Sequence, residues 1–291
     1  MTHDVQEHFV HIADLHFWQI VLNPLHLLSK RFLGNLNVLV RRRREFMMQR
    51  AEEYADAVAA TGVSSVILTG DFSSTSLDAE FVLAAKFVRG LRERGLTIQL
   101  IPGNHDVYTF GSVRTHQFER HFADFIPPDG YPSLTALPGG TPLILVPTVC
   151  PRLLSSRGTV TPRTLEYVRN MLDQCSGPVI VAAHYPFLHQ THGYASAWSR
   201  RLSHAEQLRG TLAQSGKQIL YIAGHVHRFS YERAPRCPNL TQLTTGAFFR
   251  TETEHATQGE FTEIQRRGDE FVITRHIRKM EWETQTYTDC H

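Results

Sequence analysis

Short apolar runs alternate with longer amphipathic stretches along most of the chain. The short runs are rich in Val, Ile and Leu and contain no Asp, Glu, Lys or Arg. Runs of this kind are typical of strands that are buried on both faces of a sheet. We predict strands at His8–Ala13, Ser65–Thr69, Thr97–Ile101, Leu143–Val146, Val179–Ala182 and Ile219–Ile222.

Helical patterns lie between these strands. Arg42–Ala60 is rich in Arg, Glu, Met and Ala, and Leu77–Arg94 follows Ser76, which we expect to be its N-cap. Each of these two stretches is followed by a glycine, a common helix terminator. Thr161–Pro162 begins a third helix with proline at its first position, and Ser203–Glu206 has the pattern of a capping box at the start of a fourth.

The last third of the chain changes character. Leu240–Phe248, Glu260–Gln265 and Phe271–Arg278 have the pattern of strands without intervening helices, and Arg267–Asp269 is typical of a hairpin turn. We infer an α/β fold in which antiparallel strands complete a mixed sheet, with two sheets face to face and helices outside. The final residues, about 282–291, are expected to be disordered.

Composition sets only loose bounds. The 291 residues can form one large α/β domain, so we expect 1–291 to be a single domain, and the net charge of +2 gives no reason to infer nucleic acid binding. The four cysteines form no CxxC pair, which favours reduced thiols and a cytoplasmic location. The N-terminus lacks a signal-peptide pattern, and no apolar stretch is long enough to span a bilayer.

Five short motifs of metal-binding residue types each follow a predicted strand. In open α/β sheets, ligands collect outside the carboxyl ends of the strands, so these motifs are expected to converge. Mixed carboxylate, amide and imidazole ligands suit Mn, Fe, Co, Ni or Zn. The motifs are Asp14-Leu15-His16, Gly70-Asp71, Gly103-Asn104-His105-Asp106, His184 and Gly224-His225-Val226-His227.

The spacing within the motifs fits convergence. Asp14 and His16 are two residues apart, as are His225 and His227, and in extended chain such residues point the same way. Glycine before a ligand permits a sharp turn and a close backbone approach. Seven ligands are too many for one tetrahedral ion and suit two ions that share a bridging carboxylate.

The pattern DxH…GD…GNHD…H…GHxH, which spans roughly residues 8–230, resembles that of the calcineurin-like metallophosphoesterase family. The resemblance implies a four-layer αββα sandwich of two mixed sheets with outer helices. It also implies a hydrolase of phosphodiester or pyrophosphate bonds, in which a hydroxide activated by two metal ions attacks phosphorus in line. Manganese is the expected metal, with Fe, Zn, Co and Ni as alternatives.

The resemblance implies a role for each motif residue. His105 would stabilise the transition state and help to protonate the leaving oxygen, and Asp106 would orient His105. Relatives often carry another acidic residue where this chain has Phe72-Ser73-Ser74. The first metal would be held by Asp14, His16, Asp71 and His227, and the second by Asp71, Asn104, His184 and His225.

The segment Asn23–Phe46 provides the best indication of substrate. Apolar residues recur at helical spacing, and Arg41, Arg42, Arg43 and Arg44 concentrate positive charge. Such a segment can lie on an anionic membrane surface or hold an anionic, amphiphilic substrate, which we expect Phe32 and the arginines to contact. An ordinary pair of packed surface helices would show the same pattern.

Part of this segment, Ser29–Asn37, resembles an insertion of a bacterial branch similar to enzymes that cleave UDP-2,3-diacylglucosamine in lipid A synthesis. A lipid-linked nucleotide substrate and a peripheral position on the inner face of a membrane follow as hypotheses. A cyclic-nucleotide phosphodiesterase is an alternative, as is a non-catalytic scaffold on the same fold. A metalloprotease is not supported, because the chain has no HExxH motif.

Overall fold

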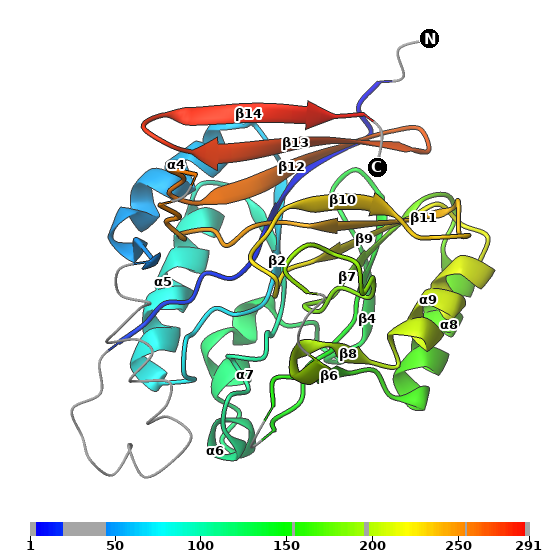
Figure 1. Cartoon of the computed structure of the whole chain (residues 1–291), viewed down its shortest axis with the longest axis horizontal. Coiled ribbons are helices and arrows are strands. Elements are labelled where there is room, and N and C mark those ends of the chain that lie inside the picture. The colour runs from blue at the N-terminus through cyan, green and yellow to red at the C-terminus, as the bar shows by residue number, and fades with distance from the viewer. Residues whose placement is uncertain (1–3, 20–44, 153–154, 195–197, 254, 289–291) are drawn as a thin grey trace.

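Two six-stranded sheets pack face to face in the computed structural model, which describes residues 4–19, 45–152, 155–194, 198–253 and 255–288 (Figure 1). The strand order is β14-β13-β12-β1-β2-β3 in the first sheet and β10-β11-β9-β7-β5-β4 in the second. The first sheet contains β1 (Glu7–Ile12), β2 (Ser65–Thr69), β3 (Thr97–Ile101), β12 (Glu260–Arg267), β13 (Glu270–Arg278) and β14 (Trp282–Tyr287). The second contains β4 (Ser133–Ala136), β5 (Pro142–Leu145), β7 (Val179–Ala182), β9 (Ile219–Ala223), β10 (Ser230–Arg233) and β11 (Leu240–Thr244).

Both sheets are mixed, as predicted. Strands β1, β2 and β3 run parallel, whereas β12, β13 and β14 continue the sheet with antiparallel pairing. In the second sheet β5, β7, β9 and β11 run parallel, between antiparallel β4 and β10. A separate parallel pair joins β6 (Gly158–Thr159) to β8 (Leu202–Ser203).

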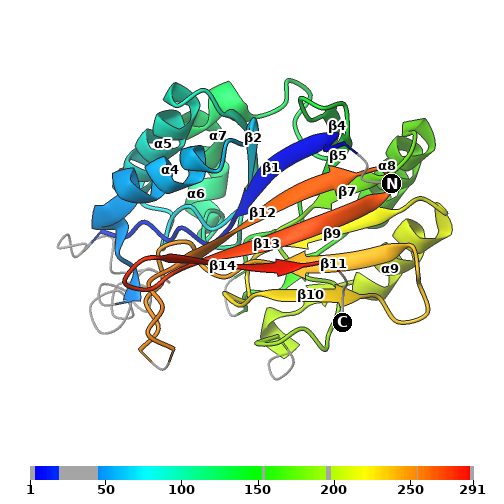
Figure 2. The same cartoon turned by 90° about the horizontal axis from the view of Figure 1, so that it is seen from above.

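Helices cover the outer face of each sheet (Figure 2). On the first sheet lie α4 (Ala51–Ala60) and α5 (Asp78–Glu93), and on the second α8 (Pro162–Gln174) and α9 (Ala205–Gln214). The shorter elements are α6 (Phe110–Arg114), α7 (Gln117–His121), η2 (Met48–Arg50), η3 (Ala123–Phe125) and η4 (Trp198–Arg200).

Three apolar layers separate the four layers of secondary structure. In β1, Phe9 packs between the two sheets whereas Val10 packs under the helices, and in β2 Ile67 and Val66 divide in the same way. Successive strand residues point to opposite faces, so a strand that is covered on both faces must be apolar throughout. The predicted four-layer αββα sandwich is confirmed, and its buried strands account for the continuous apolar runs.

The C-terminal segment differs from the prediction. Trp282–Tyr287 forms the edge strand β14 instead of a disordered tail, and only residues from 289 onward lie outside the described part. The strand is polar in its middle, so the spacing of apolar residues did not predict it. It is anchored at its ends, where the ring of Trp282 lies 5.1 Å from that of Tyr54 and the ring of Tyr287 lies 4.9 Å from that of Phe229.

Two predicted helix starts are wrong, and one is confirmed. Ser76 is not the N-cap of α5, since it adopts a left-handed conformation (φ 55°) and the helix begins at Asp78. Ser203 does not cap α9, because it lies in β8 and His204 precedes the helix without a side-chain capping bond. Thr161 does cap α8, by accepting a hydrogen bond from the backbone N–H of Thr164.

The helix predicted at Arg42–Ala60 is not continuous over its described part, residues 45–60. Its α-helical part starts at Ala51, after the 3-10 turn Met48–Arg50, and Phe46 instead forms an isolated β-bridge with Arg250. Residues 20–44 lie outside the described part of the chain. The amphipathic segment about 23–46 is therefore untested over nearly all of its length, Phe32 and Arg41–Arg44 included.

Two smaller predictions concern the cysteines and the membrane. Cys150, Cys175 and Cys237 are free thiols, as expected. Among the described residues, no helix combines the length and the apolar character needed to cross a membrane.

Candidate metal centre

All seven predicted ligands meet at one edge of the two sheets. They follow the carboxyl ends of five strands, β1, β2, β3, β7 and β9. Ligand atoms of Asp14, His16, Asp71 and His227 all lie within 4.8 Å of one another. The remaining ligands meet around the amide oxygen of Asn104, which lies 3.1 Å from His184 Nε2 and 2.9 Å from His225 Nδ1.

Asp71 lies between the two groups of ligands. Its Oδ2 is 3.6 Å from His16 Nε2 in the first group and 3.5 Å from His184 Nε2 in the second. Its Oδ1 accepts a hydrogen bond of 2.7 Å from the backbone N–H of His105. A carboxylate in this position can serve two ions at once, as the seven-ligand count predicted.

Five of the seven ligands have left-handed backbone conformations. The φ values are 56° at Asp14, 48° at His16, 57° at Asp71, 69° at His225 and 55° at His227. Such conformations are uncommon outside glycine, and they concentrate at functional sites. The expectation that each pair converges through extended backbone is therefore wrong, although the side chains of each pair do reach the cluster.

The left-handed turns direct neighbouring ligands to different places. The imidazole of His227 approaches His16, with 2.9 Å between their Nε2 atoms, whereas that of His225 approaches Asn104. Backbone hydrogen bonds hold the loops together, since His16 N–H donates to the carbonyl of Asp71 and Asp14 N–H to that of Gly70.

Two motif glycines are required by close backbone approach. A Cβ added at Gly103 would lie 2.1 Å from the backbone nitrogen of Asp71. A Cβ at Gly224 would lie 2.6 Å from that of Ala13 and 2.9 Å from the carboxylate of Asp14. These contacts are far below van der Waals distance, so a larger residue would displace the ligands.

The hydrogen bonds of the histidines leave the inner nitrogens free to ligate. His184 donates from Nδ1 to the carbonyl of Thr69 (2.7 Å), and His225 donates from Nε2 to that of Arg200 (2.9 Å). In each ring the other nitrogen faces Asn104 and carries the lone pair. A histidine whose outer nitrogen donates to a carbonyl is the usual arrangement around a protein-bound metal.

The electrostatics of the centre favour cations. Burial, reinforced by the charge of Asp71, raises the pKa of Asp14 well above its usual range and that of Asp106 to about 7. Burial lowers the pKa of His184 to about 4, and that of His225 well below its usual range. Neutral imidazoles beside buried carboxylates fit divalent ions, which would stabilise the charged carboxylates.

His105 lies beside the ligands. Its ring centroid is 4.9 Å from that of His16, and the ring stacks on Tyr108 at 5.4 Å. Its Nδ1 donates to the carbonyl of Ser74 at 2.7 Å. The sequence prediction placed Asp106 as the group that orients His105, and the orientation seen here comes from this carbonyl.

Asp106 is fully buried and binds backbone instead. It accepts hydrogen bonds from the N–H groups of Gly103, Phe72 and Ser73 and from the hydroxyl of Ser73. It thereby ties the loop after β3 to the loop after β2. The hydroxyl of Ser76 donates to the carbonyl of His105, which also lies 3.1 Å from the Ser73 hydroxyl, so the two loops are joined at several points.

Sequence reasoning missed the residues that support this loop. Glu80 is buried in α5 and accepts from the backbone N–H groups of Ser74, Thr75 and Leu77. The available signal was the run Ser73–Ser76, four hydroxyl residues directly after a metal motif. Ser73, the first of these residues, binds Asp106 through its backbone N–H and its hydroxyl.

The fold and the ligand geometry define a metal-dependent hydrolase of phosphoester bonds with a site for two divalent ions. The chain belongs to the calcineurin-like phosphoesterase family, whose model matches residues 7–229. No curated protein matches it at a significant level.

Solved structures share the fold at low sequence identity. A dimetal phosphatase from Danio rerio superposes with a TM-score of 0.65 at 14% identity, over 98% of this chain and 99% of that one. A purple acid phosphatase from yellow lupin seeds has a TM-score of 0.57 at 11% identity, over 98% and 54%. A 5'-nucleotidase from Candida albicans has a TM-score of 0.50 at 17% identity, over 90% and 48%. The chain therefore spans about half the length of the last two proteins.

Proposed function

We propose that the chain hydrolyses a phosphodiester or pyrophosphate bond with two divalent ions, manganese being the expected metal. Asp14, His16, Asp71 and His227 would hold one ion. Asp71, Asn104, His184 and His225 would hold the other. The observation that carries this assignment is the position of Asp71, whose Oδ2 lies at nearly equal distance from His16 and His184.

The metals would lower the pKa of a shared water and offset negative charge on the phosphoryl oxygens. The protein supplies the rest. The Nδ1–H of His105 is held by the carbonyl of Ser74, so Nε2 is the nitrogen that can pass a proton to the leaving oxygen. Asp106 and Ser73 keep the loop in place and so fix the distance between His105 and Asp71.

The decisive test uses a substrate panel. The metal-free protein is reconstituted with Mn²⁺ and assayed on a matched phosphomonoester, phosphodiester and nucleotide pyrophosphate, with a cyclic nucleotide as a fourth substrate. We expect two metal ions per chain and the highest kcat/KM on the diester or the pyrophosphate. Binding of two metals without hydrolysis of any of these substrates would favour the scaffold hypothesis.

A finer proposal concerns a lipid-linked nucleotide at a membrane surface, and it rests on the sequence of 23–46 alone. Its test compares a soluble diester with UDP-2,3-diacylglucosamine, in wild type and in the triple variant Leu28→Asp, Phe32→Asp, Arg42→Glu. The proposal requires a loss confined to the lipid substrate in a folded variant. If the protein has no activity on the lipid substrate, the alternative of an ordinary pair of packed surface helices would be favoured for this segment.

A further inference from the structure

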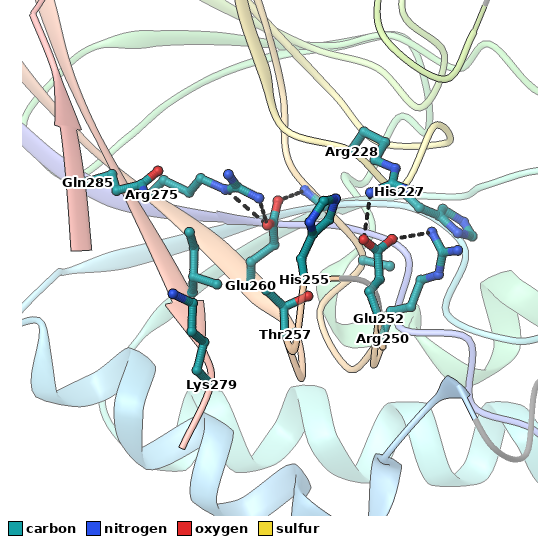
Figure 3. Close-up of a pocket in the computed structure, with 14 residues that line it drawn as sticks. His227, Arg228, Arg250, Glu252, His255, Thr257, Glu260, Arg275, Lys279 and Gln285 are labelled. Carbon is teal, nitrogen blue, oxygen red and sulfur yellow. Dashed lines mark hydrogen bonds and ion pairs between the residues drawn. The ribbon is translucent and has the colours of Figure 1, made fainter. Parts of the chain in front are cut away.

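A cavity of about 410 Å³ adjoins the metal centre (Figure 3). The candidate ligand His227 forms part of its wall, so the cavity borders the metal centre. The rest of the wall comes from Arg228 before β10, from the loop between β11 and β12, from strands β12, β13 and β14, and from Lys279 between β13 and β14. This size is within the range of pockets that bind small ligands.

Among the described residues of the cavity wall, cations outnumber carboxylates. Arg228, Arg250, Arg275 and Lys279 line it, against Glu252 and Glu260. These six residues come from parts of the sequence up to 51 positions apart, and only the fold brings them together. Backbone and small polar groups supply much of the remaining lining, so the surface suits a charged, hydrogen-bonding ligand.

The two carboxylates hold the arginines in place. Glu252 lies between Arg228 and Arg250, at 2.5 Å and 3.1 Å from a guanidinium nitrogen of each. Glu260 binds Arg275 through two guanidinium nitrogens and accepts the backbone N–H of Gly246. Figure 3 shows both glutamates between Arg275 and Arg250. Each arginine is thus fixed before any ligand arrives, which reduces the entropy cost of binding.

The arginines keep donors to spare. A guanidinium has five N–H groups, and an ion pair with one carboxylate uses one or two of them. The Nε of Arg250 is buried and has no hydrogen-bond partner within the described residues. An additional anion can therefore be bound without breaking the pairs that hold the arginines.

We propose that this pocket binds a second phosphate group of the substrate, so that the preferred substrates carry one phosphoryl group at the metals and another among Arg228, Arg250 and Arg275. The proposal rests on the proposed function and names its substrate class, a phosphoester with a second phosphate on a sugar-sized unit. Guanidinium groups match phosphate geometry through paired N–H donors. An acyl chain in the same pocket would desolvate these charges without offering them a partner.

The kinetic test uses two chromogenic diesters that differ by one phosphate, thymidine 5'-(p-nitrophenyl phosphate) with and without a 3'-phosphate. We expect wild type to favour the 3'-phosphorylated diester about tenfold or more in kcat/KM, as a charge-assisted contact would give. Arg228→Gln should reduce that preference about tenfold. The exposed Arg169→Gln in α8 is the matched control, and its preference should equal that of wild type.

A second variant, Lys279→Gln, keeps the test valid if Arg228→Gln fails to fold. The side chain of Lys279 is 40% exposed and pairs with Glu283, so Lys279→Gln leaves no buried carboxylate unpaired. It should also reduce the preference, by a smaller factor. An equal preference in wild type, Arg228→Gln and Lys279→Gln would overturn the proposal.

A binding experiment tests the phosphate pocket independently of the proposed catalytic function. Inorganic pyrophosphate is titrated calorimetrically into metal-free wild type, Arg228→Gln and Arg169→Gln. We expect weaker binding in Arg228→Gln alone, and equal binding in all three proteins would overturn the assignment of the pocket. Failure of wild type to hydrolyse either diester with any divalent metal would count against the proposed function, and the calorimetry would still decide the pocket.

Discussion

Two groups of charged residues share His227, one buried in the metal centre and one half-buried in the pocket, and their charges are balanced in different ways. In the metal centre, Asp71 faces His184, whose pKa burial lowers to about 4, and burial raises the pKa of Asp14. In the pocket, Glu252 and Glu260 each bind arginine. The first group is short of positive charge, and the second has a surplus.

This difference shows which partner each group can accept. Buried carboxylates without cations are costly, and the cost is removed when metal ions bind. Arginines that are already paired are stable without a ligand, so the pocket can persist in the free protein. One edge of the sandwich can therefore hold metal ions and, beside them, an additional anion. Changes on the metal side should have larger effects than changes elsewhere.

The largest effect is expected from Asp71→Asn. Asparagine keeps the size of the side chain but removes the charge that lies between the two ligand groups. We expect loss of bound metal and a fall in kcat/KM of about 10⁴-fold or more, because the metals supply most of the charge stabilisation. Metal content and diester hydrolysis are the measurements. Asp173→Asn on the exposed face of α8 is the control, and full metal occupancy in Asp71→Asn would show that Asp71 is not the bridge.

The strand framework and the convergence of the candidate ligands could be predicted because both depend on local pattern. Ser65–Thr69, Thr97–Ile101 and Val179–Ala182 match the observed strands at both ends, since burial on both faces demands a continuous apolar run. The candidate ligands follow the carboxyl ends of the strands. Their convergence could therefore be predicted from their positions in the chain. No sequence pattern predicted the left-handed conformations of Asp14 and His225, because these conformations arise from contacts with distant loops.

Features that depend on distant contacts could not be predicted. Strand β14 is polar and exposed in its middle, and aromatic contacts at its ends hold it. The role of Glu80 depends on the path of the loop between β2 and α5. The pocket draws on Arg228, Arg275 and residues between them, and no spacing in the sequence links these positions.

His105→Ala should have the next largest effect. The imidazole touches the metal centre without being one of its ligands, so both metals should remain. We expect kcat to fall about 10²–10⁴-fold, the range for a positioned acid or base. The loss should shrink for substrates with a good leaving group, which needs no proton. His8→Ala in β1 is the control, and loss of metal from His105→Ala would instead make His105 a ligand.

Metal removal should destabilise the fold, because it leaves the buried carboxylates of the metal centre without cations. The size of this effect should depend on pH. Burial raises the pKa of Asp14 and brings that of Asp106 to about 7, so Asp106 retains its proton in the metal-free protein at pH 5. Carboxyl groups with raised pKa lose their protons as pH rises, which destabilises the metal-free fold and favours metal binding. We expect Mn²⁺ to raise Tm by about 5 °C or more at pH 8 and by less at pH 5.5. An effect of equal size at both pH values would contradict this account.

The smallest effect tests a third group of charged residues, outside the metal centre and the pocket. Glu263 in β12 accepts hydrogen bonds of 2.7 Å from His8 and His276. Burial would raise its pKa, and these bonds outweigh that effect and lower the pKa to about 2. A lowered pKa in the folded state gives stability that is present above the unfolded pKa of about 4.5 and is lost as pH falls toward 2.

Glu263→Gln should therefore lower Tm by about 1–3 °C at pH 6, and the difference from wild type should shrink as pH falls from 5 to 3. Thermal melts of both proteins across this range provide the measurement, with the exposed Glu270→Gln in β13 as the control. Because the histidines already balance Glu263, the difference should be the same with and without Mn²⁺. A difference that changed with metal would show that this group is coupled to the metal centre, and the contrast between the regions would then fail.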